Sequence, residues 1–253
     1  MIKFFRKIRQ NLLMENKTGK YFKYAIGEII LVVIGILIAL QINNWNSGRL
    51  ERKAETEYYC QLLIDFELDK VELLELIQES KQRVEVAKQL LLDLDAQTKT
   101  KEEILLTFFY TLRSNAFIPS KSAITDLTSS GSLYLIRDKS LKKKLFEYYE
   151  DLDNKSEIAK SNRKINSDNL IKWDNILEFG WQDLSALELD KNILKTLPNL
   201  DWHLDKNSRY YTRCQEVLII SLGLNFREQE LYNIMLTDIE FLSEKLKLAC
   251  SGN

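Results

Sequence analysis

The sequence predicts an all-α protein: one N-terminal transmembrane helix followed by an elongated helical bundle with a long stalk-like first helix. The stretch from Ile29 to Leu40, IILVVIGILIAL, contains no polar side chain. The 253 residues include 8 Gly and 2 Pro, so turns must be few. From Arg49 to Asp95, apolar residues recur at alternating steps of four and three, which is the period of a packed helix.

The apolar stretch extends to a full membrane span. A bilayer core about 30 Å thick needs about 20 helical residues, and the strictly apolar run is shorter than that. It lengthens upstream to Phe22 and downstream to Trp45, and Tyr21 and Tyr24 add aromatic side chains typical of the membrane interface. Residues 21–46 are therefore predicted to form a transmembrane helix in the lipid bilayer.

Charge on either side of the span predicts its orientation. Basic residues dominate before it: Lys3, Arg6, Lys7, Arg9, Lys17, Lys20 and Lys23. The positive-inside rule places the N-terminus in the cytoplasm, with residues 47–253 as a periplasmic all-helical domain anchored in the inner membrane. Residues 1–20 are expected to be a cytoplasmic amphipathic basic segment. A cleaved signal peptide is the alternative to this signal anchor, but no small-residue cleavage site follows Leu40.

Small residues share one face of the span. They are spaced at steps of four or eight, at Gly27, Gly35, Ala39 and Asn43. Such a face lets two helices approach closely, which predicts a homo-oligomer or a membrane protein partner. Glycine is also common in membrane helices without any such role.

Glu28 is a carboxylate inside the expected boundary of the membrane. An intramembrane carboxylate suggests proton or ion coupling. The alternative is that Glu28 reaches the cytoplasmic interface, or pairs there with Lys23 about one and a half turns away.

The helix after the span has a broad apolar stripe. Its main series is Tyr59, Leu63, Phe66, Leu73, Ile77, Val84, Ala87, Leu91 and Leu94, with polar breaks at Lys70 and Ser80. Further apolar residues widen the stripe, which favours packing against helices of the same chain: Leu62, Leu74, Leu76 and Leu90. The carboxylates on this helix are expected to form a solvated face: Asp65, Asp69, Glu72 and Glu75.

Later segments predict further helices. The next has an apolar face of Ile104, Leu105, Phe108, Phe109 and Leu112. A helix from about Leu141 has few apolar residues in its middle, so it is either solvent-exposed or flexibly broken there. A core face then resumes at Trp173, Ile176, Leu177, Phe179 and Trp181. Two closing helices are expected at 207–222 and 226–249, broken near Gly223 and Asn225.

The least periodic part of the outer region contains the candidate ligand site. A short helix around Ser122 to Thr128 is followed by a polar turn, and the candidate residues are Asp126, Ser129, Ser130 and Gly131. Polar groups at a turn between helices can bind a ligand, but the same residues also simply stop and start helices.

Cys60, Cys214 and Cys250 lie far apart, which excludes a disulfide framework and a C-x-x-C metal site. Cys60 and Cys250 could form one bridge in an oxidising periplasm. Buried free thiols are the alternative.

Catalytic motifs are absent from the sequence. His203 is the one histidine, so neither a multi-histidine metal site nor an H-E-x-x-H motif is present, and a surface or packing role is expected for it. Phosphate-binding glycine loops and a nucleophile elbow are missing too. No cofactor or enzymatic activity is predicted. The region after the span is net acidic with both signs interspersed, so nucleic acid is not an expected partner.

Three stretches together resemble a known group of sequences. They are the basic start, KTGKYFKYAIGEIILVVIGILIALQINNWN from Lys17 to Asn46, and DLTSSGSLYLIRDKSLKKKLFEYYEDL from Asp126 to Leu152. The chain resembles a family of uncharacterised single-span membrane proteins of Bacteroidota. The resemblance implies membrane attachment and a helical outer domain, and brings no catalytic residue with it.

The leading hypothesis is a non-enzymatic membrane-anchored interaction or scaffold protein. The second is a sensor or accessory subunit that binds a small ligand in the helical domain and signals through a partner. A membrane-bound hydrolase is the third. A sensor needs an internal polar pocket, whereas a scaffold needs an exposed apolar surface.

Overall fold

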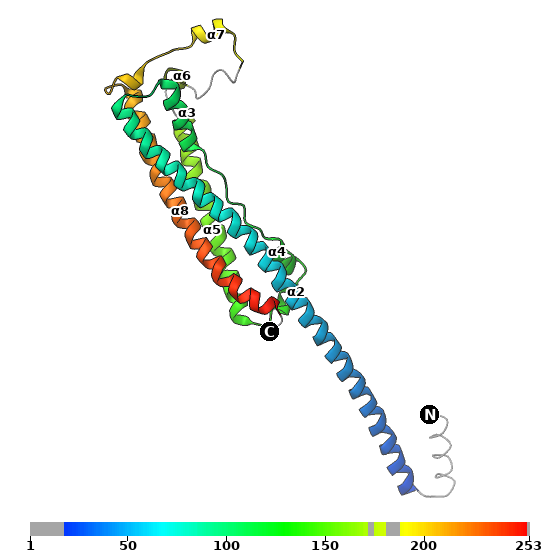
Figure 1. The fold of residues 1–253 in the computed structure, drawn as a ribbon. Coiled ribbons are helices and arrows are strands. Elements are labelled where there is room, and N and C mark those ends of the chain that lie inside the picture. Colours follow the sequence, from blue (N-terminus) through cyan, green and yellow to red (C-terminus); the bar gives the residue numbers. More distant parts are fainter. Residues whose placement is uncertain (1–17, 172–174, 181–187, 252–253) are drawn as a thin grey trace. The chain divides into compact units, whose positions relative to one another are not determined.

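A computed structural model describes residues 18–171, 175–180 and 188–251, and every element in these ranges is helical. This confirms the all-α class. In chain order the elements are α2 (Thr18–Ala96), α3 (Lys101–Leu112), α4 (Ser122–Ser129), η1 (Ser132–Leu135), α5 (Lys139–Ile171), α6 (Ile176–Phe179), α7 (Lys191–Thr196), η3 (Trp202–Leu204) and α8 (Arg209–Cys250) (Figure 1). Residues 1–17, most of the predicted amphipathic basic segment, lie outside the described ranges.

The chain divides into two compact units, Met1–Glu57 and Tyr58–Asn253, and the boundary falls within α2. In the first unit, the strongly apolar part of α2 buries none of its side chains within the described structure. Among the described helices, α2 is the one long and apolar enough to cross a membrane. The predicted span at residues 21–46 lies within it.

In the second unit, α2 and α8 run antiparallel. Residues later in α2 contact residues earlier in the C-terminal part of the chain. Cys60 is bonded to Cys250, Ser80 Oγ donates to the Asn225 carbonyl at 3.1 Å, and the Gln97 side chain donates to the η3 backbone. The α5 helix lies beside α8 along much of its length, and Figure 1 shows α2, α5 and α8 side by side.

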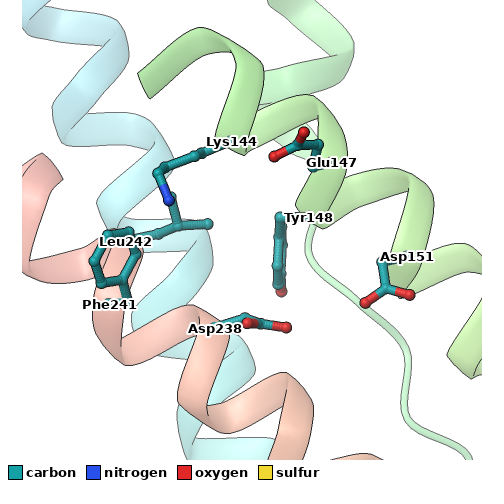
Figure 2. Close-up of a pocket in the computed structure, with 7 residues that line it drawn as sticks. All are labelled: Lys144, Glu147, Tyr148, Asp151, Asp238, Phe241 and Leu242. Carbon is teal, nitrogen blue, oxygen red and sulfur yellow. The ribbon is translucent and has the colours of Figure 1, made fainter. Parts of the chain in front are cut away.

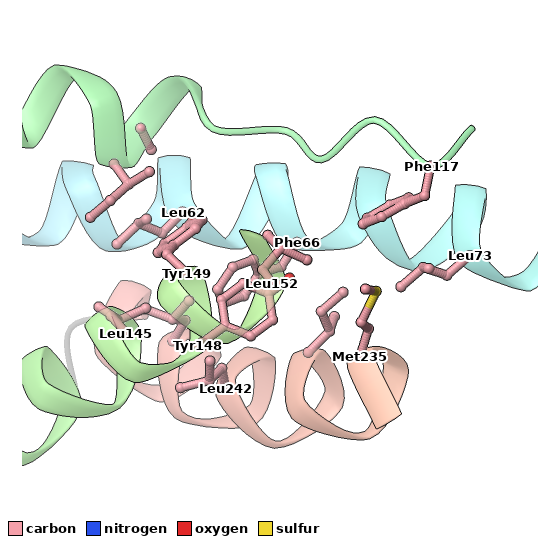
Figure 3. Close-up of a cluster of buried hydrophobic side chains, with 14 of the residues drawn as sticks. Leu62, Phe66, Leu73, Phe117, Leu145, Tyr148, Tyr149, Leu152, Met235 and Leu242 are labelled. Atoms are coloured by element: carbon pink, nitrogen blue, oxygen red, sulfur yellow. The ribbon is translucent and has the colours of Figure 1, made fainter. Parts of the chain in front are cut away.

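Two hydrophobic clusters form the core of this unit. The first joins α2, α4, α5 and α8 around Phe66, whose ring meets Tyr148 edge-on at 5.0 Å between centroids (Figure 3). The second joins α2, α3, α8 and the segment around Phe179. There Trp202 stacks on Phe179 at 4.8 Å and donates its indole N–H to the Phe179 carbonyl at 2.7 Å.

The predicted stripe on α2 faces these clusters, so packing against helices of the same chain is confirmed. Leu63 and Leu91 are only partly buried, and Leu62, Leu76 and Leu90 take deeper positions beside them. One detail differs from the prediction: Leu74 is exposed. Ser80, a predicted polar break within the stripe, is fully buried.

The α8 helix is continuous, so the predicted break near Gly223 and Asn225 was wrong. Glycine and asparagine are poor helix formers, but tertiary contacts override that preference here. The Asn225 side chain donates to the Ser221 carbonyl one turn earlier at 2.8 Å, and its Oδ1 accepts from Arg83 Nε at 2.9 Å. Asn225 is a buried link between helices.

The α5 helix also continues through its apolar-poor middle, so the flexible break was wrong, and the continuous helix is solvent-exposed on one side. Ala159 packs into the first cluster while Ile158 and Ile165 face solvent. Beyond α5, Phe179 is buried as predicted, but Leu177 is exposed, so that part of the predicted core face was wrong. Trp173 and Trp181 lie outside the described residues.

Cys60 and Cys250 form a disulfide, with their Cα atoms 5.0 Å apart. Cys214 is a buried free thiol, and burial raises its pKa above the ordinary value. The alternative of a bridge therefore holds for Cys60 and Cys250, and the alternative of a buried free thiol holds for Cys214.

Candidate functional site

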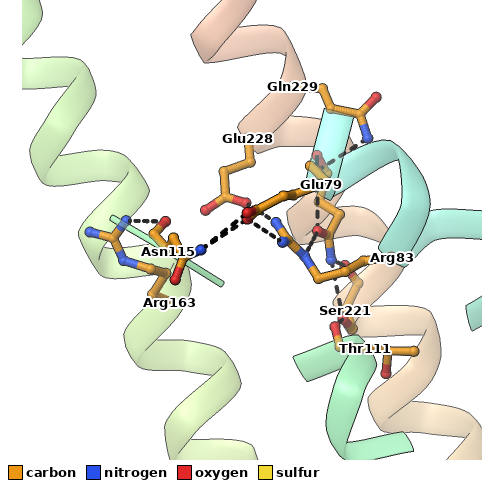
Figure 4. A network of polar contacts seen from close by, with 10 residues as sticks. Glu79, Arg83, Thr111, Asn115, Arg163, Ser221, Glu228 and Gln229 are labelled. Atoms are coloured by element: carbon orange, nitrogen blue, oxygen red, sulfur yellow. Dashed lines mark hydrogen bonds and ion pairs between the residues drawn. The ribbon is translucent and has the colours of Figure 1, made fainter. Parts of the chain in front are cut away.

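A layer of polar side chains separates the two hydrophobic clusters. We call Ser80, Arg83, Ser221, Asn225 and Glu228 the polar layer (Figure 4). Arg83 Nε donates to Asn225 Oδ1 at 2.9 Å, and its Nη2 donates to Glu228 Oε2 at 3.3 Å. Arg83 and Glu228 are only 5% and 3% exposed, so each charge is compensated inside the protein, and Glu79 lies 3.6 Å from Arg83 as a second carboxylate partner.

The polar layer connects α2 and α8 to α3. Ser221 Oγ donates to the Thr111 carbonyl at 3.0 Å, and Gln229 Nε2 donates to Ser80 Oγ at 3.2 Å. Burial raises the pKa of the Glu228 carboxyl, and the Arg83 charge opposes that shift. The network therefore links α2, α3 and α8 at one level of the domain through buried hydrogen bonds.

A second polar assembly holds a non-helical segment against α2. Residues 113–121, which we call the strap, connect α3 to α4. The Ile118 backbone N–H donates to Glu72 Oε1 at 3.1 Å, and the Ser120 N–H donates to Asp69 Oδ1 at 2.7 Å. Alternate N–H groups of an extended chain point the same way, and carboxylates three or four residues apart share a helix face.

The same row of carboxylates also begins the next helix. Asp65 accepts from Ser122 Oγ at 2.7 Å and from the Ala123 N–H at 2.8 Å, which satisfies an otherwise free donor in the first turn of α4. At the other end of the strap, Asn115 Nδ2 donates to Glu79 at 3.0 Å.

The predicted solvated face was therefore wrong for two of its carboxylates. Asp65 and Asp69 are buried, Glu72 is half-buried, and Glu75 alone among the four is exposed. Burial raises the pKa of Asp69 to about 6, against the opposing effect of its hydrogen bonds to Ser120. The sequence pattern missed this arrangement because most of the partners are backbone N–H groups in a segment without periodicity.

The predicted polar turn is the end of α4. Asp126 Oδ2 accepts from the Tyr58 hydroxyl at 2.8 Å, and the Asp126 carbonyl accepts from both the N–H and the Oγ of Ser130. Ser129 Oγ lies 3.4 Å from the same carbonyl, and Gly131 has a φ of 70°, which suits glycine. These contacts end one helix and begin the next, and a ligand role for the turn stays a prediction.

A pocket of about 170 Å³ lies between α5 and α8 (Figure 2). Its charged groups have partners within the chain. Lys144 Nζ lies 4.6 Å from the centroid of the Phe241 ring, and Lys155 pairs with both Asp151 and Asp238. The chain's own lysines therefore occupy the places where a cationic ligand would bind.

An apolar row lies on the side of α2 away from the core. Ile64, Leu68 and Val71 are 60%, 58% and 56% exposed, and steps of four and three separate them. We call them the outer row. Ile118 of the strap, 72% exposed, is held at Glu72, the residue after Val71. Large apolar side chains gathered on one face are typical of an interaction site.

The small-residue face of the span lies on the same helix. Gly27, Gly35, Ala39 and Asn43 are exposed, and a Cβ atom at Gly27 or Gly35 would meet no atom of the described residues within 4 Å. Glu28 is half-exposed in the same segment.

The described residues contain no group of three His, Cys, Asp or Glu side chains that could hold a metal ion. His203 is buried beside Trp202, with ring centroids 6.2 Å apart, so its surroundings are those of a packing residue.

Fold and surface together define a class: an all-α protein with an apolar N-terminal helix and a helical domain that presents an exposed apolar row. The chain belongs to DUF6090, a family of unknown function, which matches residues 28–156. This region includes most of the apolar part of α2, the strap and about half of α5. No curated protein and no solved structure matches the chain.

Proposed function

We propose that the protein is a non-enzymatic, single-pass membrane protein that self-associates through α2 and presents its helical domain as an interaction surface. The outer row carries this proposal. Three branched aliphatic side chains at steps of four and three form half of a helix–helix seam, and no helix of the same chain covers them in the described structure.

The partner we propose for the outer row is a second copy of the chain. The small-residue face of the span supports this choice, because it is suited to close helix approach and belongs to the same helix. Anchoring also confines copies to one plane with the same orientation. This raises their effective concentration, so a small seam can suffice.

We place the span in the inner membrane, with the N-terminus in the cytoplasm and the helical domain in the periplasm. Basic residues before the span support this orientation. The disulfide between Cys60 and Cys250 supports it independently, because disulfides persist in oxidising compartments and are rare in the cytosol.

Cysteine crosslinking in intact cells tests the proposal. Val71→Cys adds a thiol in the outer row, and Leu106→Cys adds one at a comparably exposed site on α3, where Leu106 is 51% exposed. With a short bismaleimide, we expect Val71→Cys to give a covalent dimer of the chain and Leu106→Cys to stay monomeric. Equal crosslinking of both variants, or of neither, would overturn self-association through the outer row.

A sensor is the second candidate, and the surroundings of the polar layer favour it. A pocket of about 320 Å³ opens beside Arg83, within the size range of small-molecule sites. It is lined by Glu79, Gln82, Arg83, Tyr110, Arg113, Ser114 and Asn115. A small molecule that raises the unfolding temperature of the full chain, and loses this effect in Arg113→Gln, would support the sensor over the scaffold.

A further inference from the structure

Asp69 differs from the other carboxylates that hold the strap. Asp65 uses both oxygens as acceptors, from Ser122 Oγ and the Ala123 N–H. Asp69 is completely buried, and its Oδ1 accepts from Ser120 while its Oδ2 has no hydrogen-bond partner in the described structure. A buried carboxylate oxygen without a donor is an unfavourable place for a negative charge.

The groups around Asp69 add no positive charge to offset it. On α2, the charges that act on it are those of Glu72 and Asp65, both acidic. On α5, the Tyr148 and Tyr149 hydroxyls are buried and have no hydrogen-bond partner among the described residues, and Asp238 of α8 acts on Tyr148. Within the described chain no basic side chain pairs with Asp69. Lys121, at the end of the strap, is paired with Asp153.

We propose that Asp69 is a proton-operated latch for the strap: the strap stays closed when Asp69 is protonated and opens more readily when Asp69 is ionised. The protonated acid still accepts from the Ser120 N–H, and its Oδ2 gains a proton to donate. The ionised acid is better solvated in water, and it reaches water only if residues 113–121 move away from α2.

Opening involves a large part of the strap, which limits how often it occurs. Phe117 is buried in the first hydrophobic cluster against Tyr232, at 6.3 Å between ring centroids. Opening therefore exposes an aromatic ring together with the Ile118 and Ser120 backbone N–H groups. The open strap is a minor state, of the kind that amide hydrogen exchange detects.

The direction of the pH effect follows from linkage. In the closed state burial raises the pKa of Asp69 to about 6, from the ordinary 3.8 that it regains in water. Between these values the closed state binds the proton more strongly, so raising the pH favours the open state. The opening equilibrium is expected to increase about tenfold from pH 5 to pH 7.

The latch operates within one chain, so it does not depend on self-association. Opening of the strap nevertheless changes the interaction surface. The strap carries Ile118, whose N–H donates to Glu72, the neighbour of Val71 in the outer row. Opening would take Ile118 away from the outer row. The structure therefore links proton binding at Asp69 to the shape of the surface that we assign to partners.

Amide hydrogen exchange with mass spectrometry on the full chain in detergent micelles tests the latch. After correction for intrinsic exchange rates, we expect peptides covering 113–121 to be about tenfold less protected at pH 7 than at pH 5. Asp69→Asn keeps an acceptor for Ser120 but cannot ionise, so its strap should be equally protected at both pH values.

Glu72→Gln is the matched control, because Glu72 also accepts a strap N–H but is half-buried. It should keep most of the pH dependence of the wild-type protein, because burial raises the pKa of Asp69 more than the Glu72 charge does. Equal protection of the wild-type strap at pH 5 and pH 7 would overturn the proposal even if neither variant folds. A pH dependence that survives in Asp69→Asn, or disappears in Glu72→Gln, would also overturn it.

Discussion

The buried guanidinium of Arg83 contacts three polar side chains from two helices, of which Asn225 and Glu228 are buried and Glu79 reaches solvent. Its guanidinium bonds to Asn225 and Glu228 and lies 3.6 Å from a Glu79 oxygen. A buried ion pair contributes little net stability, because desolvation offsets most of the attraction. Removing one partner costs far more, since the other charge remains buried without compensation.

Arg83→Leu is therefore expected to destabilise the helical domain by about 3–5 kcal/mol. The double variant Arg83→Leu, Glu228→Leu should recover much of the loss, because it leaves no buried charge. Chemical denaturation of the full chain in micelles, followed by near-ultraviolet circular dichroism, measures both. A double variant no more stable than the single one would contradict this account of the polar layer.

The Arg83→Leu deficit should also depend on pH. Burial raises the pKa of Glu228 and Arg83 opposes the shift, so without Arg83 the folded-state pKa rises further above its unfolded value. A carboxyl of this kind stabilises the fold when protonated, and the contribution is lost as pH rises through the folded pKa. The difference in unfolding free energy between variant and wild type should be smaller at pH 5 than at pH 8. A deficit independent of pH would assign the loss to packing.

The position and buried face of a helix could be predicted from the sequence where they depend on apolar periodicity alone. The buried face of α3 is the predicted one, because Ile104, Phe108 and Leu112 follow the helical period without interruption. The continuity of α8 was not predictable, because the residue that stabilises Asn225 lies 142 positions away. The position of the strap was not predictable either, because most of its donors are backbone N–H groups. The pairing of Cys60 with Cys250 was left open because it depends on the antiparallel packing of α2 and α8, which the sequence alone does not show.

Substitutions at two glycines test the continuity of α8 and the left-handed turn after α4. At Gly223, within α8, an added Cβ meets nothing within 4 Å, so Gly223→Ala should stabilise the domain by about 0.5–1 kcal/mol. At Gly131 the space is equally open but φ is +70°, so Gly131→Ala should destabilise it by about 1 kcal/mol. Denaturation of the two variants measures the difference. Destabilisation by Gly223→Ala would contradict a continuous α8, and stabilisation by Gly131→Ala would contradict the left-handed conformation at the turn.

The disulfide ties the end of α8 to α2. Replacing Cys60 and Cys250 with serine should destabilise the domain by about 2–5 kcal/mol, because the bridge closes a loop across most of the chain. Cys214→Ser is the control for the loss of a buried thiol. Mass spectrometry after thiol labelling of the wild-type protein should find Cys214 as the labelled cysteine, and only after unfolding. Labelling of Cys60 without a reductant would argue against the bridge.

At the scale of the whole molecule, the span and the outer row make separate contributions to one assembly. Gly35→Leu combined with Ala39→Leu fills the small-residue face and should weaken self-association in lipid, because the helices can no longer approach closely. Ile34→Leu combined with Ile38→Leu changes neighbouring positions without adding bulk and serves as the control. Particle masses of the full chain in lipid nanodiscs measure the effect. Equal particle masses for the two double variants would show that the small-residue face does not contribute to self-association.

Self-association of the full chain is the central claim, and the copy number per particle tests it most directly. We would extract the wild-type protein in native lipid particles and count copies by single-molecule photobleaching. The account predicts dimers or larger assemblies for the wild type and for Leu106→Lys, and predominantly monomers for Leu68→Lys, which places a charge in the outer row. Monomeric wild-type protein, or the same copy number in Leu68→Lys and Leu106→Lys, would contradict it.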